Sequence, residues 1–227
     1  MSDLLLTPAV RPRLWVAGPV DEILSAAATG LVEAVVTNPD VLASWREAEG
    51  VPPEKTAARI AGDTGLPVFL QLRGPDRGSF LHQAAAIRAL DPRLLPKIPA
   101  TAEGFSAAAA LRDVPVLITA VATLAQAAAA AAAGVRFLCP YFARMRDLGM
   151  DPATLCLEAS RLNGATELVP ASLRTVDDFE LALRSGSTGG IVFTGLFREM
   201  LEHDSVLRAM DGFEPAWTKC SGSILCT

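Results

Sequence analysis

The chain alternates from end to end between short apolar runs and longer amphipathic or alanine-rich stretches. Runs of four or five residues rich in Val, Leu and Ile are typical of buried β-strands. The stretches between them have the length and composition of α-helices. The runs expected to form strands are 14–17, 33–37, 68–72, 94–98, 116–120, 137–140, 167–171 and 190–194.

Helices are expected between these strands, at 20–28, 53–64, 78–90, 102–111, 124–133, 152–162, 176–185 and 196–210. Eight strand–helix pairs in about 200 residues predict a (β/α)₈ barrel (TIM barrel). A doubly wound open sheet is the alternative, but the first strand is not followed by a G-x-G-x-x-G string. We expect a single domain over 1–227, with a core at about 14–217, a C-terminal helix and a flexible tail at 218–227.

Composition and charge narrow the class of protein. Apolar residues make up 51% of the chain, which is enough for a sizeable core and argues against disorder. The net charge of -5 argues against a nucleic-acid partner, because binding phosphates needs a basic surface. The N-terminal residues lack the charged and apolar regions of a secretory signal, so we expect a cytoplasmic location.

Residues 114–135 have the length of a membrane span and carry no charge. Their first half predicts a buried strand and their alanine-rich second half a helix ending at Gly134, so we expect no membrane segment. The four cysteines show no zinc-finger or thioredoxin spacing. Cys220 and Cys226 are close enough in sequence to pair, but free thiols are expected in the cytoplasm.

Lys97 is the strongest candidate for chemistry. The chain has only three lysines, and Lys97 alone lies in an apolar strand, whereas Lys55 and Lys219 lie in a polar helix and the tail. Burial disfavours the charged ammonium and lowers the pKa, which favours a nucleophilic amine able to form a Schiff base with a ketone or aldehyde. The alternative is a lysine whose amine reaches solvent from the strand end.

Other polar side chains occur at the ends of the predicted strands. In a barrel the carboxyl ends of all strands meet on one face, where active sites lie. Each residue alone fits a helix cap or a turn, but together they predict a site at that face. The residues are Asn38, Gln71, Thr119, Tyr141, Ser172 and Arg174.

An anion clamp is predicted from Arg144, Ser172 and Arg174. Two guanidinium groups and a hydroxyl suit a phosphate monoester, and late loops of such barrels are recurrent phosphate sites. Alternatively, Arg144 and Arg174 are ordinary surface residues.

These residues resemble the small transaldolase and fructose-6-phosphate aldolase family from about Leu14 to Trp217. The most specific string is Lys-Ile-Pro-Ala-Thr-Ala-Glu-Gly at 97–104. The other matching strings are Val-Val-Thr-Asn-Pro at 35–39, Thr-Ala-Val at 119–121, Pro-Tyr-Phe-Ala-Arg at 140–144, Ala-Ser-Leu-Arg at 171–174 and Phe-Glu-Pro-Ala-Trp at 213–217.

The resemblance implies a barrel that acts through a Schiff base on Lys97, without metal or other cofactor. It implies that Gln71 and Thr119 hold a catalytic water and that Tyr141 is the acid/base. It also implies that Arg144, Ser172 and Arg174 hold a substrate phosphate, near Asn38. Members commonly form pentamers or decamers with the C-terminal helix packed on a neighbour, so we expect a homo-oligomer.

Three features depart from the family. Ala17 replaces the aspartate that usually ends the first strand, and Asp21, one helical turn on, does not simply substitute for it. Val36 replaces a usual threonine. Pro96, inside the predicted fourth strand, suggests a β-bulge beside Lys97.

Three functions therefore stay open. The first is a class I aldolase that makes or breaks a C–C bond in a phosphorylated sugar through an enamine of a dihydroxyacetone-type donor. The second is a transaldolase that passes this three-carbon unit to a phosphorylated aldose, in a specialised pathway. The third is a non-catalytic barrel, which the loss of the aspartate at position 17 favours.

Overall fold

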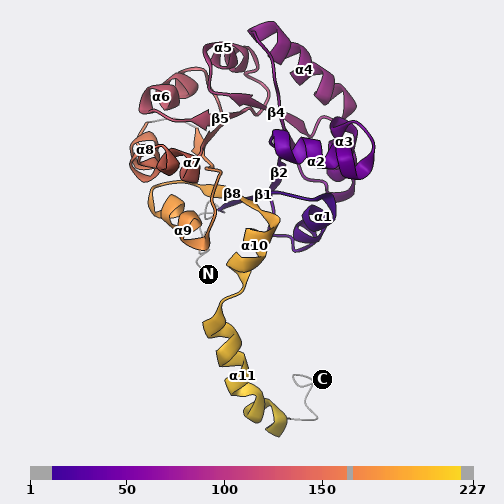
Figure 1. Ribbon diagram of the computed structural model, residues 1–227, viewed down its shortest axis with the longest axis vertical. Coiled ribbons are helices and arrows are strands. Elements are labelled where there is room, and N and C mark those ends of the chain that lie inside the picture. Colours follow the sequence, from indigo (N-terminus) through magenta and orange to yellow (C-terminus); the bar gives the residue numbers. More distant parts are fainter. Residues whose placement is uncertain (1–11, 163–165, 221–227) are drawn as a thin grey trace, which may run out of the picture.

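The computed structural model describes residues 12–162 and 166–220 and contains an eight-stranded parallel sheet curled into a barrel (Figure 1). It confirms the predicted (β/α)₈ fold, with neighbouring strands in the order β7-β6-β5-β4-β3-β2-β1-β8. The strands are β1 (Arg13–Ala17), β2 (Ala34–Val36), β3 (Val68–Gln71), β4 (Leu94–Pro99), β5 (Leu117–Val121), β6 (Phe137–Pro140), β7 (Glu167–Leu168) and β8 (Gly189–Phe193).

Helices surround this barrel on the outside (Figure 1). Most begin with a polar side chain that accepts a hydrogen bond from the first turn, as Thr101 and Thr175 do. The helices are α1 (Val20–Ala28), α2 (Pro39–Glu49), α3 (Pro53–Thr64), α4 (Arg77–Leu90), α5 (Ala102–Ala110), α6 (Leu124–Ala132), α7 (Phe142–Asp147), α8 (Pro152–Ala159), α9 (Val176–Arg184), α10 (Thr194–Leu201) and α11 (Asp204–Lys219).

The barrel closes through hydrogen bonds between the segments around β7 and β8. The N–H of Thr188 donates to the carbonyl of Leu168 at 2.9 Å, and the N–H of Ile191 donates to the carbonyl of Pro170 at 2.8 Å. β7 is shorter than the expected 167–171, although the N–H of Ala171 still donates to the carbonyl of Pro140 at 2.9 Å.

Aromatic side chains fill the interior of the barrel. Trp15 stacks on Phe69 with ring centroids 4.9 Å apart, and both rings contact Phe137 edge-on. Leu95 and Leu117 complete this buried layer. Because the layer is tightly filled, it forms a dry apolar floor below the carboxyl ends of the strands.

The strand irregularity lies in β5, not in β4. The prediction of a bulge beside Lys97 is wrong, because β4 keeps a regular register with β3. Pro96 pairs with Leu70, and Lys97 pairs with Gln71. A proline loses one ladder hydrogen bond without shifting the pairing. The register shifts instead between Thr119 and Val121.

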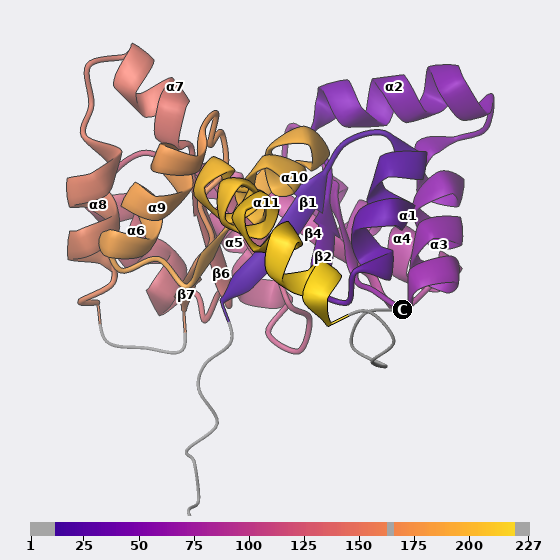
Figure 2. The same ribbon diagram turned by 90° about the horizontal axis from the view of Figure 1, so that it is seen from below.

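Helices α2 and α7 lie outside the ranges given for the expected helices, and both lie at the same end of the barrel (Figure 2). α2 follows β2 directly, and the Asn38 side chain caps it by accepting the N–H of Val41 at 2.8 Å. α7 has six residues and follows β6. Both helices therefore border the carboxyl ends of the strands.

The C-terminal helix forms an arm that projects from the barrel (Figure 1). The helix expected at 196–210 is divided, because α10 ends at Leu201 and His203 caps the start of α11. α11 includes Thr218 and Lys219, which were expected in the tail, whereas 221–227 and Cys226 lie outside the described residues. The arm exposes apolar side chains, namely Val206, Leu207, Met210, Phe213 and Trp217.

Residues 114–135 form the region of β5 and α6, as predicted. None of the helices in the described parts of the chain is both long and apolar enough to cross a membrane.

Candidate active site

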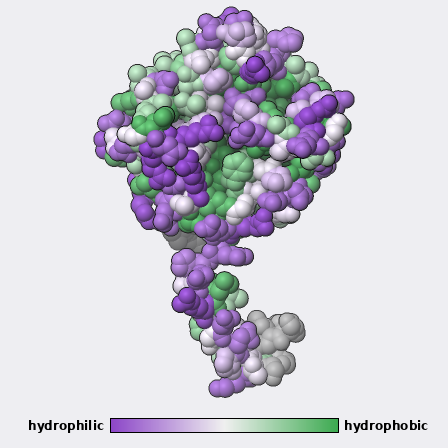
Figure 3. All heavy atoms as spheres, in the orientation of Figure 1, coloured by the Kyte–Doolittle hydropathy of each residue, from purple (hydrophilic) through white to green (hydrophobic). Residues whose placement is uncertain are grey.

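A cavity of about 130 Å³ lies at the carboxyl ends of the strands, where Figure 3 shows a hollow with hydrophobic residues on its wall. A second recess of about 550 Å³ adjoins it and shares Tyr141 and Arg144 with it. Of these two spaces, Gln71 and Thr119 line the second alone, and Arg174 lines neither. The predicted residues that line the first cavity are Asn38, Lys97, Tyr141, Arg144 and Ser172.

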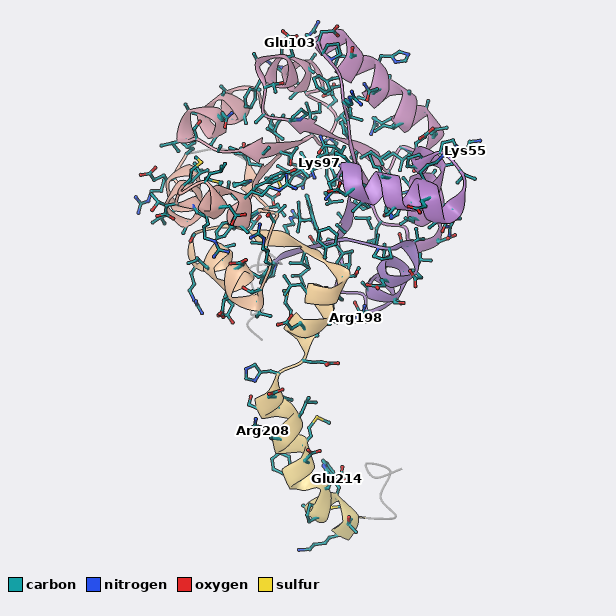
Figure 4. All side chains as sticks on the ribbon, viewed as in Figure 1. Lys55, Lys97, Glu103, Arg198, Arg208 and Glu214 are labelled. Atoms are coloured by element: carbon teal, nitrogen blue, oxygen red, sulfur yellow. The ribbon has the colours of Figure 1, made fainter. Side chains whose placement is uncertain are left out.

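Lys97 lies at the centre of the ring of strands, whereas Lys55 lies at the outer edge (Figure 4). Its side chain is buried, with 3% of the residue exposed, so the alternative of an amine reaching solvent is wrong. The Nζ atom donates a hydrogen bond to the carbonyl oxygen of Thr37 at 2.8 Å. Burial lowers the pKa of Lys97, and the positive charge of Arg144 lowers it further. The arrangement favours a neutral amine.

Tyr141 and Thr119 form a hydrogen-bonded pair beside this amine. The Thr119 hydroxyl donates to the phenol oxygen of Tyr141 at 2.9 Å, which leaves the phenol proton free for another acceptor. Burial raises the pKa of Tyr141 to about 12, so the phenol is neutral at neutral pH. The Lys97 Nζ atom lies 5.9 Å from the centroid of the Tyr141 ring. Tyr141 therefore has the protonation state of a proton donor.

Gln71 lies next to Lys97 on the neighbouring strand. Its backbone N–H donates to the Thr37 hydroxyl at 2.9 Å, and its side-chain amide donates to the Leu72 carbonyl at 3.2 Å. The amide also lies 3.4 Å from the carbonyl oxygen of Lys97. These bonds use the amide nitrogen, so the amide oxygen is the group that Gln71 offers to the second recess.

The predicted anion clamp is only partly assembled. Arg144 is exposed, stacks over the Tyr141 ring with Cζ 5.4 Å from its centroid, and lines the cavity with Ser172. Arg174 instead pairs with Asp147 through both carboxylate oxygens, at 3.2 and 2.6 Å. Arg144 and Ser172 are therefore the groups that face the cavity.

Position 17, at the end of β1, lies in the wall of the cavity. Ala17 is buried there, so the site has no carboxylate at this position. Asp21 lies outside this cavity and lines only grooves on the outer surface, which agrees with the expectation that it does not replace the aspartate.

Two further residues were missed from the sequence. Asp40, in the first turn of α2, lines the cavity, and recognising α2 as a helix bordering the mouth would have placed it there. Cys139 lies on β6, where burial raises the pKa of its thiol. Cys139 lies two residues before Tyr141, and residues two apart on a strand point to the same face of the sheet. This spacing could have placed Cys139 on the same face as Tyr141.

No group of three or more His, Cys, Asp and Glu side chains with the spacing of a metal site occurs within 12–162 and 166–220.

Comparisons with known proteins identify a family for this chain. Residues 19–183 match the family model described as transaldolase/fructose-6-phosphate aldolase. A probable transaldolase 2 from Listeria monocytogenes is 27% identical over 87% of this chain and 92% of its own length. A probable transaldolase from Phenylobacterium zucineum is 28% identical over 88% of this chain and 93% of its own.

Solved structures of lower identity share the fold. A thiamine phosphate pyrophosphorylase from Pyrococcus furiosus has a TM-score of 0.56 at 14% identity, covering 80% of this chain and 85% of its own. A monomeric dihydrodipicolinate synthase variant has a TM-score of 0.57 at 12% identity, covering 81% of this chain and 69% of its own.

Burial of the Lys97 amine should make the free energy of unfolding depend on pH. Between the lowered pKa of Lys97 and its ordinary value of 10.5, the unfolded chain binds a proton that the folded chain has released. Stability of the native chain should rise with pH in this window, by at most about 1.4 kcal/mol per pH unit. Lys97→Met should therefore be more stable than the native chain, with an advantage that shrinks toward pH 10.5.

Urea unfolding at several pH values between about 7 and 10 measures this difference, with Lys55→Met as the control. An advantage of Lys97→Met that does not change with pH would contradict a buried neutral amine.

Proposed function

This chain belongs to the transaldolase/fructose-6-phosphate aldolase family, and we propose that it is a class I aldolase that forms a Schiff base on Lys97. The observation that carries the proposal is the amine of Lys97, buried at the carboxyl ends of the strands beside the Tyr141 and Thr119 pair. A neutral amine and a nearby proton donor are what enamine chemistry requires.

In the proposed reaction the lone pair of the Lys97 amine attacks the carbonyl carbon of a ketose. The carbonyl oxygen leaves as water, and a protonated imine remains. Cleavage of the bond between the carbons α and β to the imine sends its electron pair into an enamine, while the β-hydroxyl loses its proton and becomes the aldehyde. Protonation of the enamine carbon and hydrolysis then release the donor ketone and the free amine.

Tyr141 moves protons in this scheme. Its phenol accepts from Thr119, which leaves its own proton available to another acceptor. A water held by the Thr119 hydroxyl and the amide oxygen of Gln71 links the phenol to the substrate. The shared lining of the second recess by Gln71, Thr119 and Tyr141 supports this assignment.

The substrate phosphate is proposed to bind Arg144 and Ser172, with Asn38 contacting substrate hydroxyls. Asn38 lines the same cavity, and since its side-chain oxygen caps α2, its amide nitrogen is the group that it can offer to the substrate. Arg174 joins the phosphate only after its ion pair with Asp147 opens. The proposed substrate is thus a phosphorylated sugar.

A transaldolase is the second candidate. The named relatives are probable transaldolases, which favours transfer of the enamine to a phosphorylated aldose. Gln71 and Tyr141 favour protonation and release, because the resemblance places glutamate and phenylalanine there in the transaldolase branch. The two reactions share every step up to the enamine.

We further propose a cytoplasmic homo-oligomer, a pentamer or decamer, acting without metal. Within the described residues the buried thiols of Cys139 and Cys156 are free, which is consistent with a reducing compartment. The apolar face of α11 supports packing on a second copy, because such a face is stabilised when covered.

Borohydride trapping tests the Schiff base. Incubation with fructose 6-phosphate or dihydroxyacetone and sodium borohydride should add one reduced adduct on Lys97, located by peptide mass spectrometry. Lys97→Met should lose the adduct and all turnover, while Lys55→Met should keep both. No adduct with any ketose would contradict both enzymatic proposals and favour the non-catalytic barrel. Release of dihydroxyacetone without an acceptor distinguishes the aldolase from the transaldolase.

The anion site is tested by two arginine variants. Arg144→Ala should raise the KM for fructose 6-phosphate about tenfold or more, because a charged hydrogen bond is lost, and should change the KM for unphosphorylated fructose far less. Arg174→Ala should have a smaller effect, since its guanidinium is paired with Asp147. Equal effects of Arg144→Ala on both substrates would remove Arg144 from the phosphate site.

The arm is tested through its apolar face. The double variant Met210→Glu with Phe213→Glu should lower the assembly size measured by light scattering, because it places charges on the face proposed to pack on a neighbour. Leu148→Glu, at a residue 77% exposed on the barrel, is the control. A native chain that runs as a monomer would contradict the proposed oligomer.

A further inference from the structure

Two ion pairs join α7 to α9 and to the segment that precedes α9. Arg146 on α7 pairs with Asp178 on α9 at 2.6 Å. Asp147, the last residue of α7, pairs with Arg174 at 2.6 Å. α7 and α9 are neighbours on the outer wall of the barrel (Figure 1).

The two ion pairs differ in their exposure to solvent. The side chain of Asp178 is only 4% exposed, whereas those of Arg174 and Asp147 are 57% and 56% exposed. An exposed ion pair contributes little to structure, because water screens it. A buried carboxylate must instead be held by fixed partners. The pair of Asp178 with Arg146 is therefore the one able to fix the position of α7.

Asp178 holds the segment before α9 as well. One of its carboxylate oxygens meets the Arg146 guanidinium, and the other accepts the backbone N–H of Arg174 at 2.8 Å. The backbone N–H of Asp178 donates to the Thr175 hydroxyl at 3.2 Å, which caps α9. One buried carboxylate thus connects a side chain of α7 to the backbone two residues after Ser172.

The backbone at Ser172 needs such support. Its φ of 59° lies in the left-handed region, which a serine adopts only where its surroundings impose it. The carbonyl of Ser172 accepts the N–H of Ala143 at 3.0 Å, and the N–H of Arg174 is held by Asp178. These bonds lie on either side of Ser172 and keep its backbone in this conformation.

The helix α7 depends on its neighbours in the same way. It has six residues, and so short a helix is not stable by itself in water. The N–H of Phe142 ties its first turn to the carbonyl of Ala171 at 2.9 Å, and the pair of Arg146 with Asp178 ties its last turn. Arg144 lies between these two connections.

We propose that Asp178 is a positioning residue for the substrate phosphate. It sets the Arg144 guanidinium of α7 and the hydroxyl of Ser172 at the separation that one anion can bridge. Asp178 itself does not line the cavity that those two groups line. The inference rests on the phosphate site proposed for Arg144 and Ser172. Binding by two groups on different elements weakens when their relative position is lost.

Binding of inorganic phosphate to the native full-length chain tests this without catalysis. Phosphate that binds the folded chain raises the midpoint of thermal unfolding, and its concentration dependence at constant ionic strength gives a Kd. Asp178→Asn keeps a side-chain oxygen for the Arg174 N–H but loses the charge that holds Arg146. We expect it to raise the Kd about tenfold, as for loss of one charged hydrogen bond. Arg144→Ala verifies that the titration reports the proposed site.

The sign of this effect is informative. Removing a negative charge near an anion site would, by charge alone, strengthen phosphate binding. A raised Kd for Asp178→Asn therefore reports lost positioning. Glu180→Gln removes a carboxylate from an exposed ion pair on the same helix and should not raise the Kd. Asp147→Asn, which opens the exposed pair with Arg174, should not raise it either.

Steady-state kinetics give a readout that a loss of folded protein does not move. Asp178→Asn should raise the KM for fructose 6-phosphate by a similar factor and change kcat and the KM for unphosphorylated fructose little. A merely destabilised chain would instead show a lower apparent kcat for both substrates at unchanged KM. Arg146→Gln, at a side chain 45% exposed, removes the other partner and should reproduce the rise in KM.

The outcomes separate this inference from the proposed phosphate site. If the native chain binds phosphate and Asp178→Asn leaves the Kd unchanged or lowers it, the positioning role is overturned and the phosphate site stands. If phosphate does not stabilise the native chain, the phosphate site fails and this inference with it. An equal rise in Kd with Glu180→Gln would also overturn the positioning role. If Asp178→Asn does not fold, the Kd and KM of Arg146→Gln decide.

Discussion

The chemistry proposed for this site depends on keeping an uncharged amine in the interior of a barrel. Trp15, Phe69 and Phe137 belong to a buried apolar layer inside the barrel, below the strand ends that carry Lys97. Among the described residues, the carbonyl of Thr37, 2.8 Å away, accepts a hydrogen bond from the amine. Burial lowers the pKa of Lys97, and this effect outweighs the opposing interaction with the Cys139 thiol.

Because the interior of the barrel is apolar, the polar groups of the site lie at the carboxyl ends of the strands. Parallel strands direct their carboxyl ends to one face, and the in-register pairing of Gln71 with Lys97 and of Thr119 with Cys139 brings distant residues to one height. Tyr141 is the N-cap residue of α7, and its phenol accepts a hydrogen bond from Thr119. The groups proposed for proton transfer, water binding and anion binding are therefore arranged around a single amine.

The fold and Lys97 could be predicted from the sequence because both follow from local pattern. Alternating apolar runs define strands, and a single lysine in such a run identifies the amine. The ion pair of Arg174 with Asp147 could not be predicted, since it joins the end of α7 to the segment between β7 and α9. The break between α10 and α11 at His203 was also missed, because apolar residues continue at helical spacing across it. Contacts between distant segments decide such features.

The strand ends divide the wall of the cavity between apolar and polar side chains. Ala17, Val36 and Phe193, at the ends of β1, β2 and β8, make one side of this wall apolar. The amine of Lys97 comes from β4, whereas Tyr141 is the N-cap of α7 and Arg144 lies within α7. Because position 17 and the groups proposed for bond making and proton transfer belong to different elements, the loss of a carboxylate at position 17 leaves the amine and its proposed proton donor in place.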